Sequence, residues 1–96
     1  MVTHIVMFKF KEENRDSNIS QVKDMLNGLI NQVPSLLSME VGVDFSKKDR
    51  AMDLSIITTF KDKDSLNNYA IAPAHLKVIE FIKEVTEYTK VVDYES

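Results

Sequence analysis

The sequence predicts an α+β domain whose elements follow the order β-α-β-β-α-β. Three observations lead to this prediction. Alternating apolar patterns, typical of strands, occur near both ends of the chain and twice in its middle. Two amphipathic regions with three- and four-residue steps, typical of helices, separate these strands. No repeat or linker interrupts the 96 residues, so residues 1–96 are expected to form a single domain.

Residues 2–11 form the first predicted strand. One face of it carries Val2, His4, Val6, Phe8 and Phe10. The other face is also apolar, at Ile5 and Met7, before it becomes charged at Lys9. A two-layer domain needs to cover only one face of its sheet, so apolar residues on both faces predict that the second face is covered as well.

The first predicted helix follows the polar segment EENRDS and ends before Pro34. Asp16 and Ser17 are suitable residues for its start. Its apolar face consists of Ile19, Val22, Met25, Leu26, Leu29, Ile30 and Val33. Gly28 within a helix costs about 1 kcal/mol relative to Ala, so close packing against a neighbouring element is expected there.

Two strands are then predicted as a hairpin. Apolar residues alternate over residues 37–45, from Leu37 to Phe45, and again over residues 54–60. The charged segment SKKDR, residues 46–50, lies between them and is expected to be a solvated loop.

The last third of the sequence predicts two helical segments and a closing strand. Asp62 or Asp64 can start a short helix. Pro73 suits the first turn of the next helix, which continues to about Glu84. Alternation over residues 86–95 predicts the final strand.

This order is the ferredoxin-like arrangement, a four-stranded antiparallel sheet with helices on one face. The other face would be bare in a single subunit. Because the first strand is apolar on both faces, we expect two copies to pair through it as a homodimeric α/β barrel.

Composition argues against several classes of function. The net charge of −3 is scattered, with no basic block for nucleic acid. The absence of Cys removes disulfides and thiolate chemistry, and two His residues without Cys or an HExxH spacing do not suggest a metal site. No segment has a signal-peptide pattern or is long enough to cross a membrane. We therefore expect a soluble, cytoplasmic protein without membrane partners, metal or cofactor.

His75 is the first candidate functional residue. It follows Pro73 by two residues and shares a helical stripe with Val78, Ile79 and Ile82, so it should point toward the sheet. Burial and the positive end of the helix both favour a neutral imidazole, which can accept a proton. The alternative is a half-buried His that only bonds a backbone group or Tyr69.

His4 and Tyr69 are the other two candidates. His4 lies on an apolar strand face, and if the helices cover that face, His4 and His75 enter one cavity. The alternatives are a core His bonded to the last strand or to Tyr94, and a core Tyr with its hydroxyl at the rim.

The segments HIVMFKFK, VPSLLSMEVG, DLSIITTF, YAIAPAH and VVDYE, in this order, resemble the stress-responsive dimeric α/β-barrel (Dabb) family over nearly the whole chain. The resemblance implies a homodimer with a cavity between sheet and helices in each subunit. The best-understood members of the family that the chain resembles are plant polyketide cyclases that use no cofactor. In these a His acts as the base for an aldol-type ring closure, and a nearby Tyr helps to hold the substrate. By motif position, these residues correspond to His75 and Tyr69, and His4 corresponds to a His on the first strand.

Two positions depart from the family pattern. Ala72 stands where the helix motif usually has its first His, and Leu54 stands where the plant cyclases carry another cavity His.

The sequence thus predicts a dimer that binds a small, mainly apolar molecule. Its candidate catalytic residues are His75, Tyr69 and His4. Its expected ligand-contacting residues are Val6, Phe8, Leu54, Ile56 and Ile79. Two alternatives stay open: a polyketide-cyclase-like enzyme with a His base and no cofactor, and a structural dimerisation module without a ligand.

Overall fold

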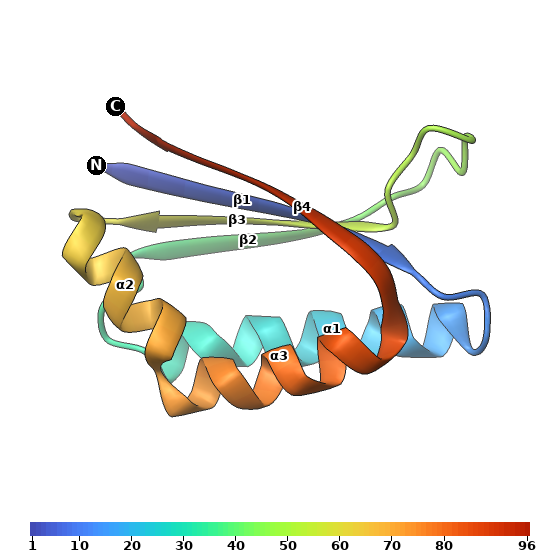
Figure 1. The fold of residues 1–96 in the computed structure, drawn as a ribbon, viewed down its shortest axis with the longest axis horizontal. Coiled ribbons are helices and arrows are strands. Elements are labelled where there is room, and N and C mark those ends of the chain that lie inside the picture. Colours follow the sequence, from blue (N-terminus) through green and yellow to red (C-terminus); the bar gives the residue numbers. More distant parts are fainter.

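One antiparallel sheet of four strands, with helices on one of its faces, makes up the computed structural model, which describes residues 1–96 (Figure 1). The elements in chain order are β1 (Val2–Phe10), α1 (Arg15–Gly28), a 3₁₀ turn (Leu29–Asn31), β2 (Ser38–Val43), β3 (Leu54–Phe60), α2 (Lys63–Ile71), α3 (Pro73–Val85) and β4 (Thr86–Glu95). The strand order is β2-β3-β1-β4. The fold is ferredoxin-like, as predicted.

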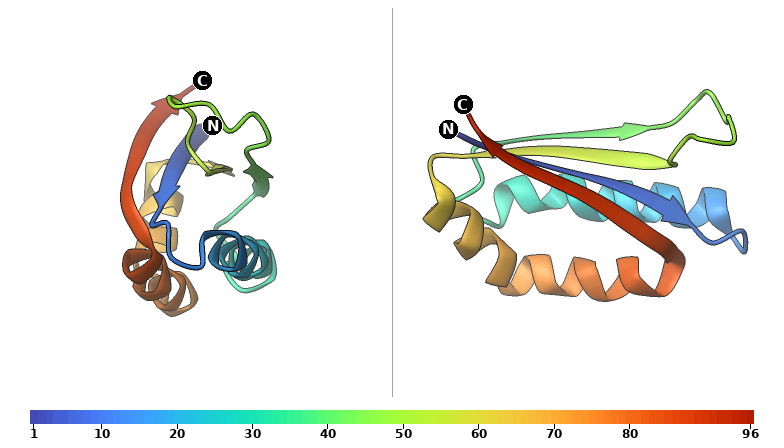
Figure 2. Two further views of the ribbon diagram at one scale, coloured as in Figure 1. Left: turned by 90° about the vertical axis from the view of Figure 1, so that its right-hand side faces the viewer. Right: turned by 45° about the horizontal axis from the view of Figure 1, so that its top comes forward.

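The core lies between the sheet and the helices. Strand β1 is central and pairs with β3 on one side and β4 on the other. Its face with Val2, Phe8 and Phe10 is buried against the helices, whereas Met7 on the opposite face is exposed. Helices α1 and α3 lie side by side beneath the sheet (Figures 1 and 2). No helix covers the second face, where Met7, Val92 and Tyr94 are exposed.

Helix α1 differs from the prediction at both ends. It begins at Arg15, after Asn14 in the left-handed region with φ 54°, which Asn tolerates better than most residues. The predicted cap at Asp16 or Ser17 was therefore late by two or three residues. The α-helix ends at Gly28, where the 3₁₀ turn begins.

The expectation of close packing at Gly28 was wrong. A Cβ atom there would meet only the flexible side chain of Gln32, at 3.7 Å, which is an ordinary contact. Gly28 marks the change from α to 3₁₀ geometry, where a residue of low helix propensity costs less than in a helix interior.

Strand β2 is shorter than predicted. It spans Ser38–Val43, so Leu37 and Phe45 lie outside it, and Phe45 is 94% exposed. The chain leaves the strand at Asp44, whose carboxylate accepts hydrogen bonds from the Ser46 hydroxyl and the Lys47 N–H. This local turn, which the alternating pattern does not reveal, ends the strand two residues early.

The predicted helix starts near Asp62 and Pro73 are confirmed. The Asp62 side chain accepts a hydrogen bond of 2.8 Å from the Ser65 N–H at the start of α2. Pro73 begins α3, and Ala72 before it is extended because a residue preceding proline avoids the α region. None of the helices has both the length and the apolar character needed to span a bilayer.

Candidate functional site

A cavity of about 550 Å³ lies between the sheet and helices α2 and α3. Strands β1, β3 and β4 supply one wall, and the helices supply the other. The apolar lining includes Val6, Phe8, Leu26, Ile56, Leu66, Ile79, Ile82 and Val91. Four of the five expected ligand-contacting residues therefore line this cavity: Val6, Phe8, Ile56 and Ile79.

Leu54 is the exception and does not line this cavity. It is 2% exposed and packed into the core, where β3 pairs it with Phe8 of β1 and Val43 of β2. Its side chain fills space at the end of the sheet away from α2, so the prediction that it faces the same ligand as Ile56 is corrected.

The three candidate polar residues meet at this cavity from different elements. His4 comes from β1, Tyr69 from α2 and His75 from α3, and all three line it. The ring centroids of Tyr69 and His75 are 4.2 Å apart, and those of Tyr69 and His4 are 6.4 Å apart. Tyr69 thus contacts both His rings, and a single small molecule can reach all three.

The break between α2 and α3 produces this arrangement. The extended Ala72 turns the chain between the two helices, so Tyr69 near the end of α2 and His75 in the first turn of α3 face each other. The Nδ1 atom of His75 lies 3.1 Å from the carbonyl oxygen of Ala70, across the same turn. Ala72, in the place of the motif's usual first His, packs against the core instead.

The His75 ring is held as a neutral imidazole with one nitrogen free. A carbonyl oxygen can only accept, so Nδ1 of His75 carries the hydrogen that it donates to Ala70. Burial lowers the pKa of His75 below its ordinary value of 6.5, against the opposing effect of the Ala70 hydrogen bond, and nearby His4 lowers it further. Near pH 7 the Nε2 atom is then unprotonated and can accept a proton.

Tyr69 has the complementary property of a donor. Its side chain is 3% exposed and packs on Phe60, with ring centroids 5.2 Å apart. Burial raises the pKa of Tyr69 to about 12, and no hydrogen bond within the chain contributes to this shift. Its hydroxyl therefore stays protonated at neutral pH and is available to donate to a ligand oxygen.

His4 has a partner that sequence reasoning missed. Its Nδ1 atom pairs with Oδ1 of Asp93, the residue directly opposite it in the β1–β4 ladder. The expectation of a His bonded to the last strand is confirmed, but with Asp93 rather than Tyr94. A carboxylate on Nδ1 fixes the ring and leaves Nε2 as the nitrogen available to a ligand.

Strand β4 supplies other lining residues that were not predicted, among them Thr89 and Val91. The alternation of β4 contains them, but the register that turns Val91 toward the cavity and Val92 away from it depends on pairing with β1. No group of three or more His, Asp or Glu side chains is arranged to hold a metal ion.

Known proteins match this chain along almost its whole length. The model of the family described as Stress responsive A/B Barrel Domain (Dabb) matches residues 2–96. The olivetolic acid cyclase of Cannabis sativa is 24% identical over 95 residues, which are 97% of this chain and 94% of the cyclase.

The stress-response A/B barrel domain-containing protein DABB1 of Arabidopsis thaliana is 29% identical over 100 residues, covering 98% of this chain. This chain spans only 46% of that relative. Among solved structures, a dimeric protein of unknown function with a ferredoxin-like fold from Bacteroides fragilis superposes with a TM-score of 0.90 at 24% identity. The match covers 99% of this chain and 95% of that one.

Proposed function

Since the chain belongs to the stress-responsive A/B barrel (Dabb) family, we propose that it forms a homodimer in which each subunit binds a small, mainly apolar molecule between its sheet and helices. The observation that carries this proposal is the convergence of His75, Tyr69 and His4 on one largely apolar cavity. A well-formed apolar cavity with a few converging polar groups is the usual form of a small-molecule site.

The homodimer is supported by the uncovered face of the sheet. Met7, Val92 and Tyr94 are exposed there, and apolar surface of this kind is stabilised by burial against a second copy. The similar structure from Bacteroides fragilis is described as dimeric.

A second candidate function is proton transfer without a cofactor. It is favoured by the pairing of a neutral imidazole, His75, with a protonated phenol, Tyr69, at a ring separation of 4.2 Å. In such a reaction Nε2 of His75 takes a proton from a carbon next to a carbonyl. The electron pair of that C–H bond forms the C=C bond of an enolate, the π electrons of the carbonyl move to its oxygen, and the Tyr69 hydroxyl donates a hydrogen bond to that oxygen.

The reactive enolate carbon can then attack a second carbonyl of the same molecule, which closes a ring by an aldol step, and the protonated His75 returns its proton to the alkoxide that forms. The name of the olivetolic acid cyclase, which is 24% identical, is consistent with this class of reaction. His4, fixed by Asp93, would orient a polar group of the substrate.

Filling the cavity mouth tests the binding proposal. Val91 lines the cavity yet is 61% exposed, so Val91→Trp adds bulk at the mouth without disturbing the buried core. Small molecules extracted by organic solvent from the purified protein, and quantified by mass spectrometry, should fall about tenfold or more in this variant.

Ile71→Trp is the matched control, because Ile71 is 71% exposed and does not line the cavity. It should retain the wild-type amount. Equal recovery from both variants would mean that the molecule is not held in this cavity. An empty wild-type protein would argue for a structural module without a ligand.

A further inference from the structure

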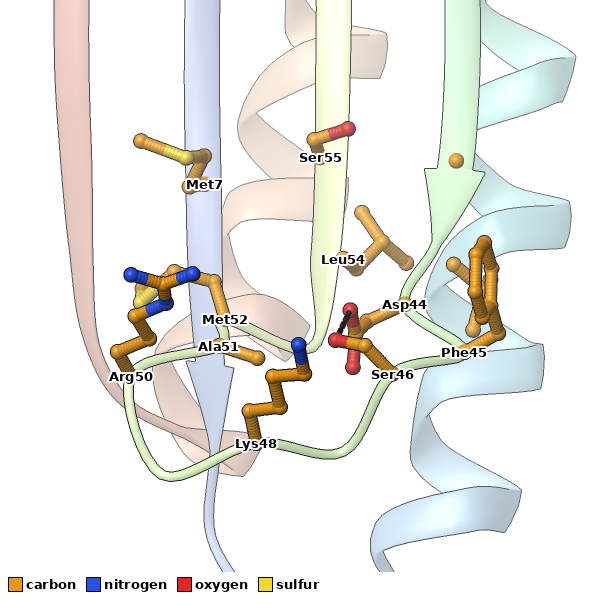
Figure 3. Close-up of a pocket in the computed structure, with 12 residues that line it drawn as sticks. Met7, Asp44, Phe45, Ser46, Lys48, Arg50, Ala51, Met52, Leu54 and Ser55 are labelled. Carbon is orange, nitrogen blue, oxygen red and sulfur yellow. Dashed lines mark hydrogen bonds between the residues drawn. The ribbon is translucent and has the colours of Figure 1, made fainter.

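A hollow of about 560 Å³ lies on the face of the sheet that the helices leave uncovered, between Met7 of β1 and the loop of residues 44–53 (Figure 3). The homodimer proposed above covers this face with a second copy. In that dimer the hollow is part of the interface.

An outer hollow, of about 390 Å³, lies on the other side of the sheet, between α2 and the last residues of β4. Asp93 and Glu95 of β4 line it, and they are paired in the β1–β4 ladder with His4 and Val2. Directly paired residues share a face of a sheet, so these carboxylates lie on the face that the helices cover. Among the residues that line the outer hollow, only Tyr94 belongs to the opposite face. The outer hollow therefore opens on the helix side, away from the face that a second copy covers.

A thin partition separates the outer hollow from the cavity of the candidate site. Leu66 of α2 is the one residue that lines both. It is half-buried and packs against the core, which holds its side chain in place. His4 lines the cavity, Asp93 lines the outer hollow, and their side chains are bonded to each other. The partition thus consists of Leu66 and the His4–Asp93 pair.

The groups that can bind an oxygen atom of a ligand lie beside this partition. Leu66 precedes Tyr69 by three residues, so their side chains are neighbours on α2. The Tyr69 ring lies in turn beside the rings of His4 and His75. From His75 the cavity extends along α3 to Ile82, which is roughly 10 Å at the helical rise per residue. The phenol and the imidazoles are therefore at the closed end, and the apolar length of the cavity leads away from them.

We propose that the partition of Leu66 and the His4–Asp93 pair selects ligands whose carbonyl group lies next to the end of an apolar chain. A methyl group fits between the bound carbonyl and the partition, whereas a longer arm meets Leu66. Methyl ketones and related compounds are then bound, and compounds with a carbonyl in the middle of the chain are excluded. This inference rests on the binding function proposed above, because it requires the carbonyl oxygen to accept a hydrogen bond from Tyr69.

Two isomeric ketones, 2-nonanone and 5-nonanone, test this selection in the wild-type protein. They have the same composition, but 2-nonanone has a methyl and a heptyl arm, whereas 5-nonanone has two butyl arms. One butyl arm must face the partition, whichever way the molecule enters. Each methylene kept out of the cavity costs roughly fourfold in affinity, so 2-nonanone should bind about tenfold or more tightly. Titration of the full chain, followed by ¹H–¹⁵N NMR at residues 66–79, measures both affinities.

Leu66→Ala removes the apolar part of the partition. In this variant 5-nonanone should bind within about twofold of 2-nonanone, because its second arm can extend into the outer hollow. Leu66→Val makes a smaller opening and should lower the preference part of the way, so it serves as a second variant should Leu66→Ala fail to fold.

Ile79→Ala is the matched control for the variant Leu66→Ala. Ile79 is also half-buried and lines the cavity but not the outer hollow, and the substitution removes the same number of carbon atoms. It enlarges the cavity and leaves the partition intact, so the preference for 2-nonanone should stay at about tenfold or more.

Equal binding of the two ketones by the wild-type protein would overturn the inference and leave the binding proposal standing. An unchanged preference in Leu66→Ala would also overturn it. So would a loss of preference in Ile79→Ala, because cavity volume rather than the partition would then decide. If the wild-type protein binds neither ketone, the binding function itself fails, and the inference fails with it.

Discussion

Replacing Phe60 by Ala should lower the free energy of unfolding by about 3–5 kcal/mol. Phe60 is fully buried at the end of β3, where it packs between the sheet and the Tyr69 ring. Its truncation removes apolar burial and leaves a void beside α2 that the close-packed core fills only in part. Urea unfolding at fixed protein concentration, followed by far-UV circular dichroism, measures this loss.

Phe45→Ala is the matched control for this measurement. It removes the same side chain from a position that is 94% exposed, so stability should change by about 0.5 kcal/mol or less. Similar losses in the two variants would mean that Phe60 is not part of the core. The expected difference matters for the site as well, since Phe60 supports the ring of Tyr69.

The second large effect is expected on proton transfer. His75→Ala should slow enzyme-dependent exchange of the α-protons of phenylacetone for deuterium by about 10²–10⁴-fold, the usual contribution of a general base. Tyr69→Phe should cause a smaller loss, because it removes one hydrogen bond to the enolate and leaves the base. Exchange is measured by ¹H NMR in D₂O.

Lys77→Ala serves as the control on the same helix, since Lys77 is exposed and does not line the cavity. It should exchange at the wild-type rate. An unchanged rate in His75→Ala, with normal circular dichroism, would exclude His75 as the base and leave binding as the remaining function.

The pH dependence of this exchange follows from the environment of His75. Burial lowers its pKa below 6.5, so the neutral, active form is already dominant at a pH where an exposed His is still protonated. The rate should therefore rise with pH below 6.5 and be level above it. A rate that continues to rise through pH 7 would show that burial does not lower the pKa of His75.

Much of the fold follows from local patterns. The strand alternations, the cap at Asp62 and the proline at the start of α3 are short-range signals, and each corresponds to an element of the structure. The errors at Gly28 and Phe45 have a local origin as well. Helix α1 ends at a 3₁₀ turn and strand β2 ends at a turn bonded by the Asp44 side chain, so both elements stop before the apolar pattern does.

The candidate site required information about pairing. The strand face of His4 and the helical stripe of His75 were sufficient to expect both in one cavity. Asp93 and Val91 could be assigned to the cavity face of the sheet only once the pairing register of β1 and β4 was known. A shift of that register by one residue would turn both side chains to the opposite face. Leu54 shares a face with Ile56 but lies two residues from it along the strand, where it is packed in the core outside the cavity.

A native mass spectrum of the purified protein tests the central claim most directly. The account predicts a species of twice the 11.0 kDa chain mass that carries up to two additional small molecules, one in each subunit. The added mass should disappear in Val91→Trp, while the dimer remains. A species with no added mass, or an adduct retained in full by Val91→Trp, would contradict the proposal that the cavity of His75, Tyr69 and His4 is a binding site.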